Sequence, residues 1–99
     1  LRAVRESRGS MITVSDQAIL EAIPALARKS GIFAEPAGSA AFAGLLKMAE
    51  EGLLEPSENV AVVITGNGLK DIESARKSVG EPLRVAPDLE DLRKKLDKS

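Results

Sequence analysis

Residues 60–65, with the sequence Val-Ala-Val-Val-Ile-Thr, form a run that is apolar on both faces and leaves few choices of fold. This pattern is typical of a central strand in a parallel sheet, because such a strand is covered on both sides and does not alternate with polar residues. Gly66-Asn-Gly68 follows directly. The sequence therefore predicts a buried strand that stops at a glycine turn.

On both sides of this run, apolar residues recur at the spacing of an α-helix. Capping residues and glycines set the expected ends of each helix. The predicted helices are Asp16 to Ser30 after Ser15, about Ala37 to Glu51 after Pro36, Ile72 to Val79 after Asp71, and a last helix that Asp88 caps. Leu1 to Arg8 is expected to be the end of a helix. Further strands are expected at Ser10 to Val14 and Pro82 to Val85.

Alternation of strands and helices predicts an α/β fold with parallel pairing. We expect one segment over residues 1–99, a small three-layer unit with a short parallel sheet and flanking helices. A chain of 99 residues buries only a modest core. The opening helix has no initiating Met and no capping residue before it, so a fragment of a longer protein is expected.

Composition excludes several classes of function. The chain has no cysteine and no histidine, which removes disulfides, thiolate zinc sites and imidazole bases, and no metal site is expected. A net charge of -1 and 2% aromatic residues give nucleic acid neither a basic surface nor a stacking platform. The longest uncharged stretch is too short to cross a bilayer. We expect a soluble, cytoplasmic chain.

The glycine turn Thr65-Gly66-Asn67-Gly68 is the first candidate site. Ligands in open α/β sheets bind beyond the carboxyl ends of the strands, and glycines let a ligand approach the backbone. A plain tight turn explains the same residues and is favoured by spacing alone. Neither common phosphate-binding glycine pattern is present, so nucleotide binding is not indicated.

The second candidate is Glu35, which stands before Pro36 and a helix start made of small residues. Accessible amides at such a start could receive an anion or the edge of a cofactor. Acidic residues are also common there for electrostatic reasons alone, and both interpretations stay open. Lys70 follows the glycine turn, and an ordinary solvated lysine is favoured over a Schiff-base lysine there.

Two stretches carrying these candidates, Gly31 to Leu45 and Val63 to Asp71, resemble the C-terminal part of threonine synthase. The resemblance covers about Leu1 to Ser78. It implies part of the cofactor-binding domain of a fold-type II pyridoxal-phosphate enzyme. Members of that family are usually dimers and convert O-phosphohomoserine and water to threonine and phosphate.

The resemblance also implies roles for individual residues. Thr65 would meet the pyridine nitrogen of pyridoxal phosphate, while Gly66 and Gly68 would let the strand end pass close to the ring. Asn67 and Glu35 would line the site. The Schiff-base lysine and the phosphate loop of the family are absent from these 99 residues. No catalytic residue is therefore assigned, and the isolated chain is expected to be inactive without the N-terminal part of the parent enzyme.

Two other interpretations remain open. One is a noncatalytic, standalone α/β module that binds a small anion at the glycine turn. The other is a structural module that associates with itself through apolar surface, as a homodimer or larger assembly.

Overall fold

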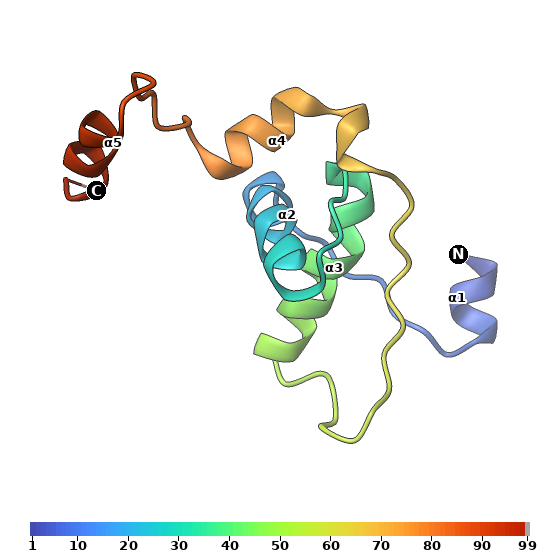
Figure 1. Cartoon of the computed structure of the whole chain (residues 1–99). Helices are drawn as coiled ribbons and strands as arrows, with labels where there is room; N and C mark the ends of the chain where they lie inside the picture. Colours follow the sequence, from blue (N-terminus) through green and yellow to red (C-terminus); the bar gives the residue numbers. More distant parts are fainter. Residues whose placement is uncertain (99) are drawn as a thin grey trace.

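The computed structural model describes residues 1–98, which form an elongated molecule with extents of 61 × 29 × 21 Å. In Figure 1, α2 and α3 lie side by side with α4 above them, while α1 and α5 stand at opposite sides. The helices of the described residues are α1 Arg2–Glu6, α2 Asp16–Ser30, α3 Pro36–Glu50, the short 3₁₀ helix η1 Gly68–Lys70, α4 Ile72–Val79 and α5 Leu89–Leu96.

The predicted bounds of α2 and α4 are confirmed, whereas α3 begins and ends one residue earlier than predicted and α1 is shorter than the predicted stretch from Leu1 to Arg8. Ser15 starts α2 by accepting a hydrogen bond from the Ala18 amide at 3.1 Å, and Gly31 ends it in the left-handed conformation at φ 74°. Pro36 is the first residue of α3. Asp71 and Asp88 cap α4 and α5 with their carboxylates.

The prediction of a parallel sheet is corrected. Residues 10–14, 60–65 and 82–85 have no strand ladder within the described part of the chain. The one bridge there joins Ala34 to Asn67 and is antiparallel. A strand needs a neighbouring backbone to pair with, and these three runs have none among residues 1–98. They lie instead as single stretches of chain, and residues 60–65 pass alongside α3 (Figure 1).

The core lies between α2 and α3 and consists mainly of small residues. Its buried apolar side chains are Ala22, Ile23, Leu26, Ala34 and Ala43. Large apolar side chains remain outside it, such as Met11, which is 76% exposed, and Val63, which is 71% exposed. The packed part of the fold is therefore narrow, and it is the part that positions the candidate site.

Candidate functional site

The two candidate motifs meet in space. The Glu35 amide donates a hydrogen bond to the Gly66 carbonyl, and the Gly68 amide donates one to the Phe33 carbonyl, both at 3.0 Å. Ala34, which sits in the bridge between them, is fully buried. The segment before α3 and the glycine turn therefore form one unit, which we call the motif junction: residues 33–38 and 65–70.

Close packing at the motif junction explains three glycines. A Cβ on Gly38 would lie 3.0 Å from the Gly66 carbonyl oxygen and 3.2 Å from its nitrogen. A Cβ on Gly66 would overlap the Glu35 carboxylate, and one on Gly68 would overlap the Phe33 ring. The first turn of α3 is closely approached, as its small residues predict, and the group that approaches it is the Gly66 backbone.

The Glu35 carboxylate lies next to Gly66 of the glycine turn and forms an ion pair with Lys70. The Lys70 Nζ donates to the Glu35 Oε1 at 3.0 Å, and the Glu35 side chain is only 17% exposed whereas that of Lys70 is 63% exposed. The Glu35 carboxylate accepts no bond from the amides of α3. Sequence reasoning noted both residues but missed their pairing, because only the backbone bridge brings them together.

Side-chain caps at Asn67 and Asp71 fix the backbone that follows the glycine turn. The Asn67 Oδ1 accepts a hydrogen bond from the Leu69 amide at 2.9 Å and so starts η1. Asp71 then accepts from the Ser74 amide at 3.0 Å and from the Ser74 hydroxyl at 2.7 Å. These bonds, led by the one from the Ser74 amide, lower the pKa of Asp71 below its ordinary value of 3.8. The path of the chain after Thr65 is thereby fixed.

Thr65 is exposed, and its hydroxyl has no hydrogen-bond partner within residues 1–98. It borders a shallow pocket of about 270 Å³. The pocket is lined by Ile32, Phe33, Ile64, Thr65, Gly66 and Asn67. Of the predicted site residues, Thr65, Gly66 and Asn67 line the pocket. Glu35 and Gly68 do not line it, but their amide hydrogen bonds hold the neighbouring backbone in the motif junction.

Ile32 and Phe33 are pocket residues that sequence reasoning did not select. Both are large apolar residues directly before Ala34, and 45% and 36% of their surfaces are exposed. Their position next to the Glu-Pro motif is the sequence signal that could have identified them. A larger hollow of about 610 Å³ opens between α2 and α3, but none of the residues of the motif junction line it.

The described residues lack two other kinds of feature. Residues 1–98 contain no group of three or more Asp, Glu, His or Cys side chains arranged to hold a metal ion. None of the helices in that range has the length and apolar character needed to span a membrane.

Comparison with known proteins supports the resemblance inferred from the two motifs. Residues 1–66 match the family described as pyridoxal-phosphate dependent enzyme. The threonine synthase of Methanocaldococcus jannaschii is 41% identical over 94 residues, which cover 95% of this chain and 23% of that protein. The threonine synthase of Bacillus sp. is 44% identical over 78 residues, which cover 79% of this chain and 22% of that protein. A threonine synthase of Mycobacterium tuberculosis is 40% identical over 89 residues, covering 88% and 25%. The chain spans about a quarter of the length of these relatives.

Proposed function

Because the chain belongs to the family of pyridoxal-phosphate dependent enzymes, we propose that it forms one wall of the cofactor site of a threonine synthase. The reaction is the conversion of O-phosphohomoserine and water to threonine and phosphate. The observation that carries this proposal is the motif junction, which joins the two motifs that resemble threonine synthase beside the Thr65 hydroxyl. The segment would be the C-terminal part of the cofactor-binding domain.

The residues at the pocket fit the ring of pyridoxal phosphate. A pyridine ring is flat and largely apolar, with one polar atom at its nitrogen. Ile32, Phe33 and Ile64 supply apolar surface, and Thr65 supplies one hydroxyl. Gly66 and Asn67 complete the lining with backbone and amide groups.

Thr65 is the residue assigned to the ring nitrogen. Its hydroxyl can donate or accept one hydrogen bond and carries no charge, so it does not force the ring nitrogen to stay protonated as a carboxylate would. When bound, pyridoxal phosphate acts as an electron sink at the reacting carbon of an amino acid. A neutral hydroxyl at position 65 would make the bound ring withdraw electrons less strongly than a carboxylate partner would.

The other residues act on the position of Thr65. The bonds from the Glu35 and Gly68 amides fix the turn on either side of Asn67, and the Glu35 to Lys70 ion pair closes the same turn from below. These groups touch one another and the backbone. Their proposed role is to hold the Thr65 hydroxyl at one place.

The 99 residues supply no Schiff-base lysine motif and no phosphate loop. In the proposal these come from the rest of a longer polypeptide, and the isolated chain does not turn over substrate. Soluble, cytoplasmic occurrence and assembly as a homodimer belong to the same proposal.

The test replaces the matching region of the Methanocaldococcus jannaschii threonine synthase with this chain and measures threonine formation from O-phosphohomoserine. Thr65→Ala should lower kcat about tenfold or more, since one hydrogen bond to a ring that carries changing charge contributes about 1.5 kcal/mol. The absorbance spectrum of the bound cofactor should shift as well. Thr65→Ser, which keeps the hydroxyl, should recover most of the rate.

The matched control is Thr13→Ala, because Thr13 is the other threonine, is exposed and lies outside the pocket. It should change kcat less than twofold. Equal effects of the two alanine substitutions would refute the role of Thr65. A chimera that binds the cofactor with a spectrum dependent on Thr65 but makes no threonine would refute the proposed substrate.

A further inference from the structure

We propose that Asn67-Gly68 is a site of spontaneous deamidation that the motif junction holds closed, so that modified chains are those in which the junction has opened. The inference concerns the chain itself and does not depend on a bound cofactor. Asn67-Gly68 is the one place in the 99 residues where an asparagine or aspartate precedes a glycine. Because glycine has no Cβ, its backbone nitrogen is open to close approach by the preceding side chain.

Deamidation at this position uses only atoms of the chain and water. The Gly68 nitrogen gives up its proton and attacks the side-chain carbonyl carbon of Asn67, so that a nitrogen–carbon bond forms. The bond from that carbon to the amide nitrogen breaks, and the amide nitrogen leaves as ammonia with the proton. Water then opens the cyclic imide at either of its carbonyl carbons and leaves aspartate or isoaspartate at position 67. No oxidant or reductant takes part.

The hydrogen bonds of the motif junction keep the reacting groups out of position. The imide ring closes only when the Gly68 nitrogen turns about the Asn67 Cα–C bond until it eclipses Cβ, and at the observed ψ of 142° it is turned well away. This rotation moves the Gly68 N–H and the Asn67 C=O together, because they belong to one planar peptide unit. The Gly68 amide donates to the Phe33 carbonyl at 3.0 Å, and the Asn67 carbonyl accepts from the Lys70 amide at 3.1 Å. Ring closure therefore breaks both bonds.

Packing resists the same rotation. A Cβ on Gly68 would overlap the Phe33 ring, so this ring lies directly against the Gly68 backbone. The Asn67 side chain is held as well, since its Oδ1 accepts from the Leu69 amide at 2.9 Å. Asn67 is nevertheless exposed, whereas Gly68 is buried. Water thus reaches Asn67 in the closed chain, and the fixed position of the Gly68 nitrogen is what prevents the reaction.

Opening of the motif junction therefore sets the rate of modification. Short segments of a folded chain open locally, and a slow reaction of the open form follows its population. Either product replaces the neutral Asn67 amide at the pocket by a carboxylate. Isoaspartate also adds one carbon to the backbone at the residue that bridges Ala34, so the junction cannot close again in the same register. A modified chain keeps a permanent record of the opening.

The experiment incubates the 99-residue chain at mildly alkaline pH, in buffer and in urea, and follows both asparagines by peptide mass spectrometry. Asn59 is the internal control, because it is exposed and precedes Val60, whose branched side chain hinders attack by the backbone nitrogen. In urea, Asn67 should convert at least tenfold faster than Asn59. In buffer, this ratio should be at least fivefold lower than in urea. The products at position 67 should include isoaspartate, which hydrolysis of the side chain without an imide does not form.

Gly38→Ala links the reaction to the motif junction, because its methyl group would lie 3.0 Å from the Gly66 carbonyl oxygen. It should raise the conversion of Asn67 in buffer at least threefold. Gly44→Ala is the matched control on the same helix, since its methyl group would meet only the Ile12 side chain at 3.4 Å. It should not raise the conversion.

Phe33→Ala is a second variant for the case that Gly38→Ala loses the circular dichroism of its helices. It removes the ring that covers Gly68 and should also raise the conversion at least threefold. An equal ratio of Asn67 to Asn59 conversion in buffer and in urea would overturn the proposal, and so would aspartate without isoaspartate. Folded variants that convert Asn67 no faster than the parent chain would overturn it too. These readouts involve neither cofactor nor substrate, so failure of the proposed function leaves them unchanged.

Discussion

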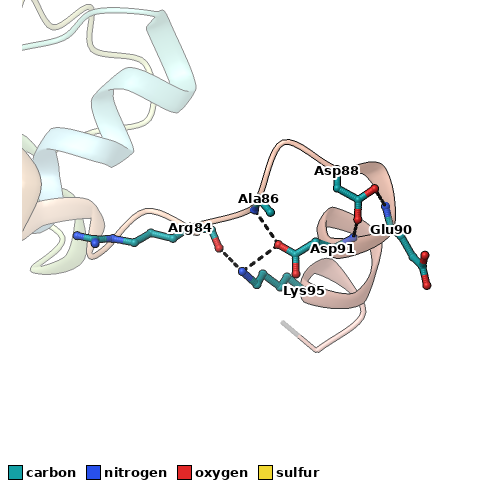
Figure 2. Close-up of polar contacts among 6 residues, drawn as sticks. All are labelled: Arg84, Ala86, Asp88, Glu90, Asp91 and Lys95. Carbon is teal, nitrogen blue, oxygen red and sulfur yellow. Dashed lines mark hydrogen bonds and ion pairs between the residues drawn. The ribbon is translucent and has the colours of Figure 1, made fainter.

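The motif junction and the C-terminal arm, residues 81–98, hold their shapes in different ways. At the motif junction, bonds join residues far apart in the sequence, and Gly38 packs directly on the Gly66 backbone. In the arm, the contacts are local and polar. The Ala86 amide donates to the Asp91 carboxylate at 2.8 Å, and the Lys95 Nζ donates to the Arg84 carbonyl at 2.5 Å. Figure 2 shows these contacts.

Substitutions in the two regions should therefore have effects of different reach. The contacts of the arm stay within the arm, since Lys95 also forms an ion pair with Asp91 at 3.1 Å. Figure 1 shows α5 apart from α2 and α3. Changes there should stay in the arm. The motif junction instead links α3 to the chain on both sides of the glycine turn. Changes there should spread to Thr65.

The largest expected effect is at Gly38. Gly38→Ala places a methyl group against the Gly66 backbone, which is already fixed by the bond from Glu35 and cannot yield as a side chain would. Overpacking of this kind costs about 1–2 kcal/mol in the free energy of unfolding. Chemical denaturation followed by circular dichroism measures it.

Gly44 provides the matched control, because it is also a buried glycine of α3 but would meet only the Ile12 methyl group at an ordinary 3.4 Å. Gly44→Ala should be neutral or stabilise by up to about 1 kcal/mol through helix propensity. If both variants lose the same stability, close packing at Gly66 does not distinguish the motif junction.

The helices and their caps were predictable because each depends on residues within one or two turns. Ser15, Asp71 and Asp88 each bond an amide two or three residues onward, and such patterns are visible in sequence. The predicted sheet is absent from residues 1–98, because an apolar run indicates burial but does not show which backbone would pair with it. The Glu35 to Lys70 pair was likewise invisible, since it follows from a bridge between distant segments.

The next largest expected effect is a difference between the two regions in their response to low pH. The bond from the Ala86 amide, followed by the one from Lys95, lowers the pKa of Asp91 below its ordinary value of 3.8. A lowered pKa means that the charged carboxylate stabilises the arm fully above the ordinary pKa, and this stabilisation is lost as the pH falls through the lowered pKa. The protection of the α5 amides, measured relative to the intrinsic exchange rate at each pH, should therefore fall as the pH drops below about 4.

The backbone bonds of the motif junction involve no titrating group, so the Glu35 and Gly68 amides should respond less over the same pH range. Asp91→Asn should remove most of the loss of α5 protection in acid. Equal protection in acid for the parent chain and this variant would show that Asp91 does not hold the arm.

The smallest expected effect is the coupling between Glu35 and Lys70. Because Lys70 is 63% exposed, water and salt screen the pair, and a double-mutant cycle with Glu35→Gln and Lys70→Met should give about 0.5 kcal/mol. Raising the salt concentration should reduce it further. A coupling of zero at low salt would show that this ion pair does not help to hold the motif junction.

The rate of amide hydrogen exchange at Glu35 and Gly68 in the isolated chain tests whether the two motifs are joined beside Thr65. Their amides bond to the Gly66 and Phe33 carbonyls, whereas the amide of Val63 has no backbone partner within the described residues. We predict exchange at least tenfold slower at Glu35 and Gly68 than at Val63, after correction for local sequence. Equal rates at the three amides would contradict it, because the two motifs would then not be joined beside Thr65.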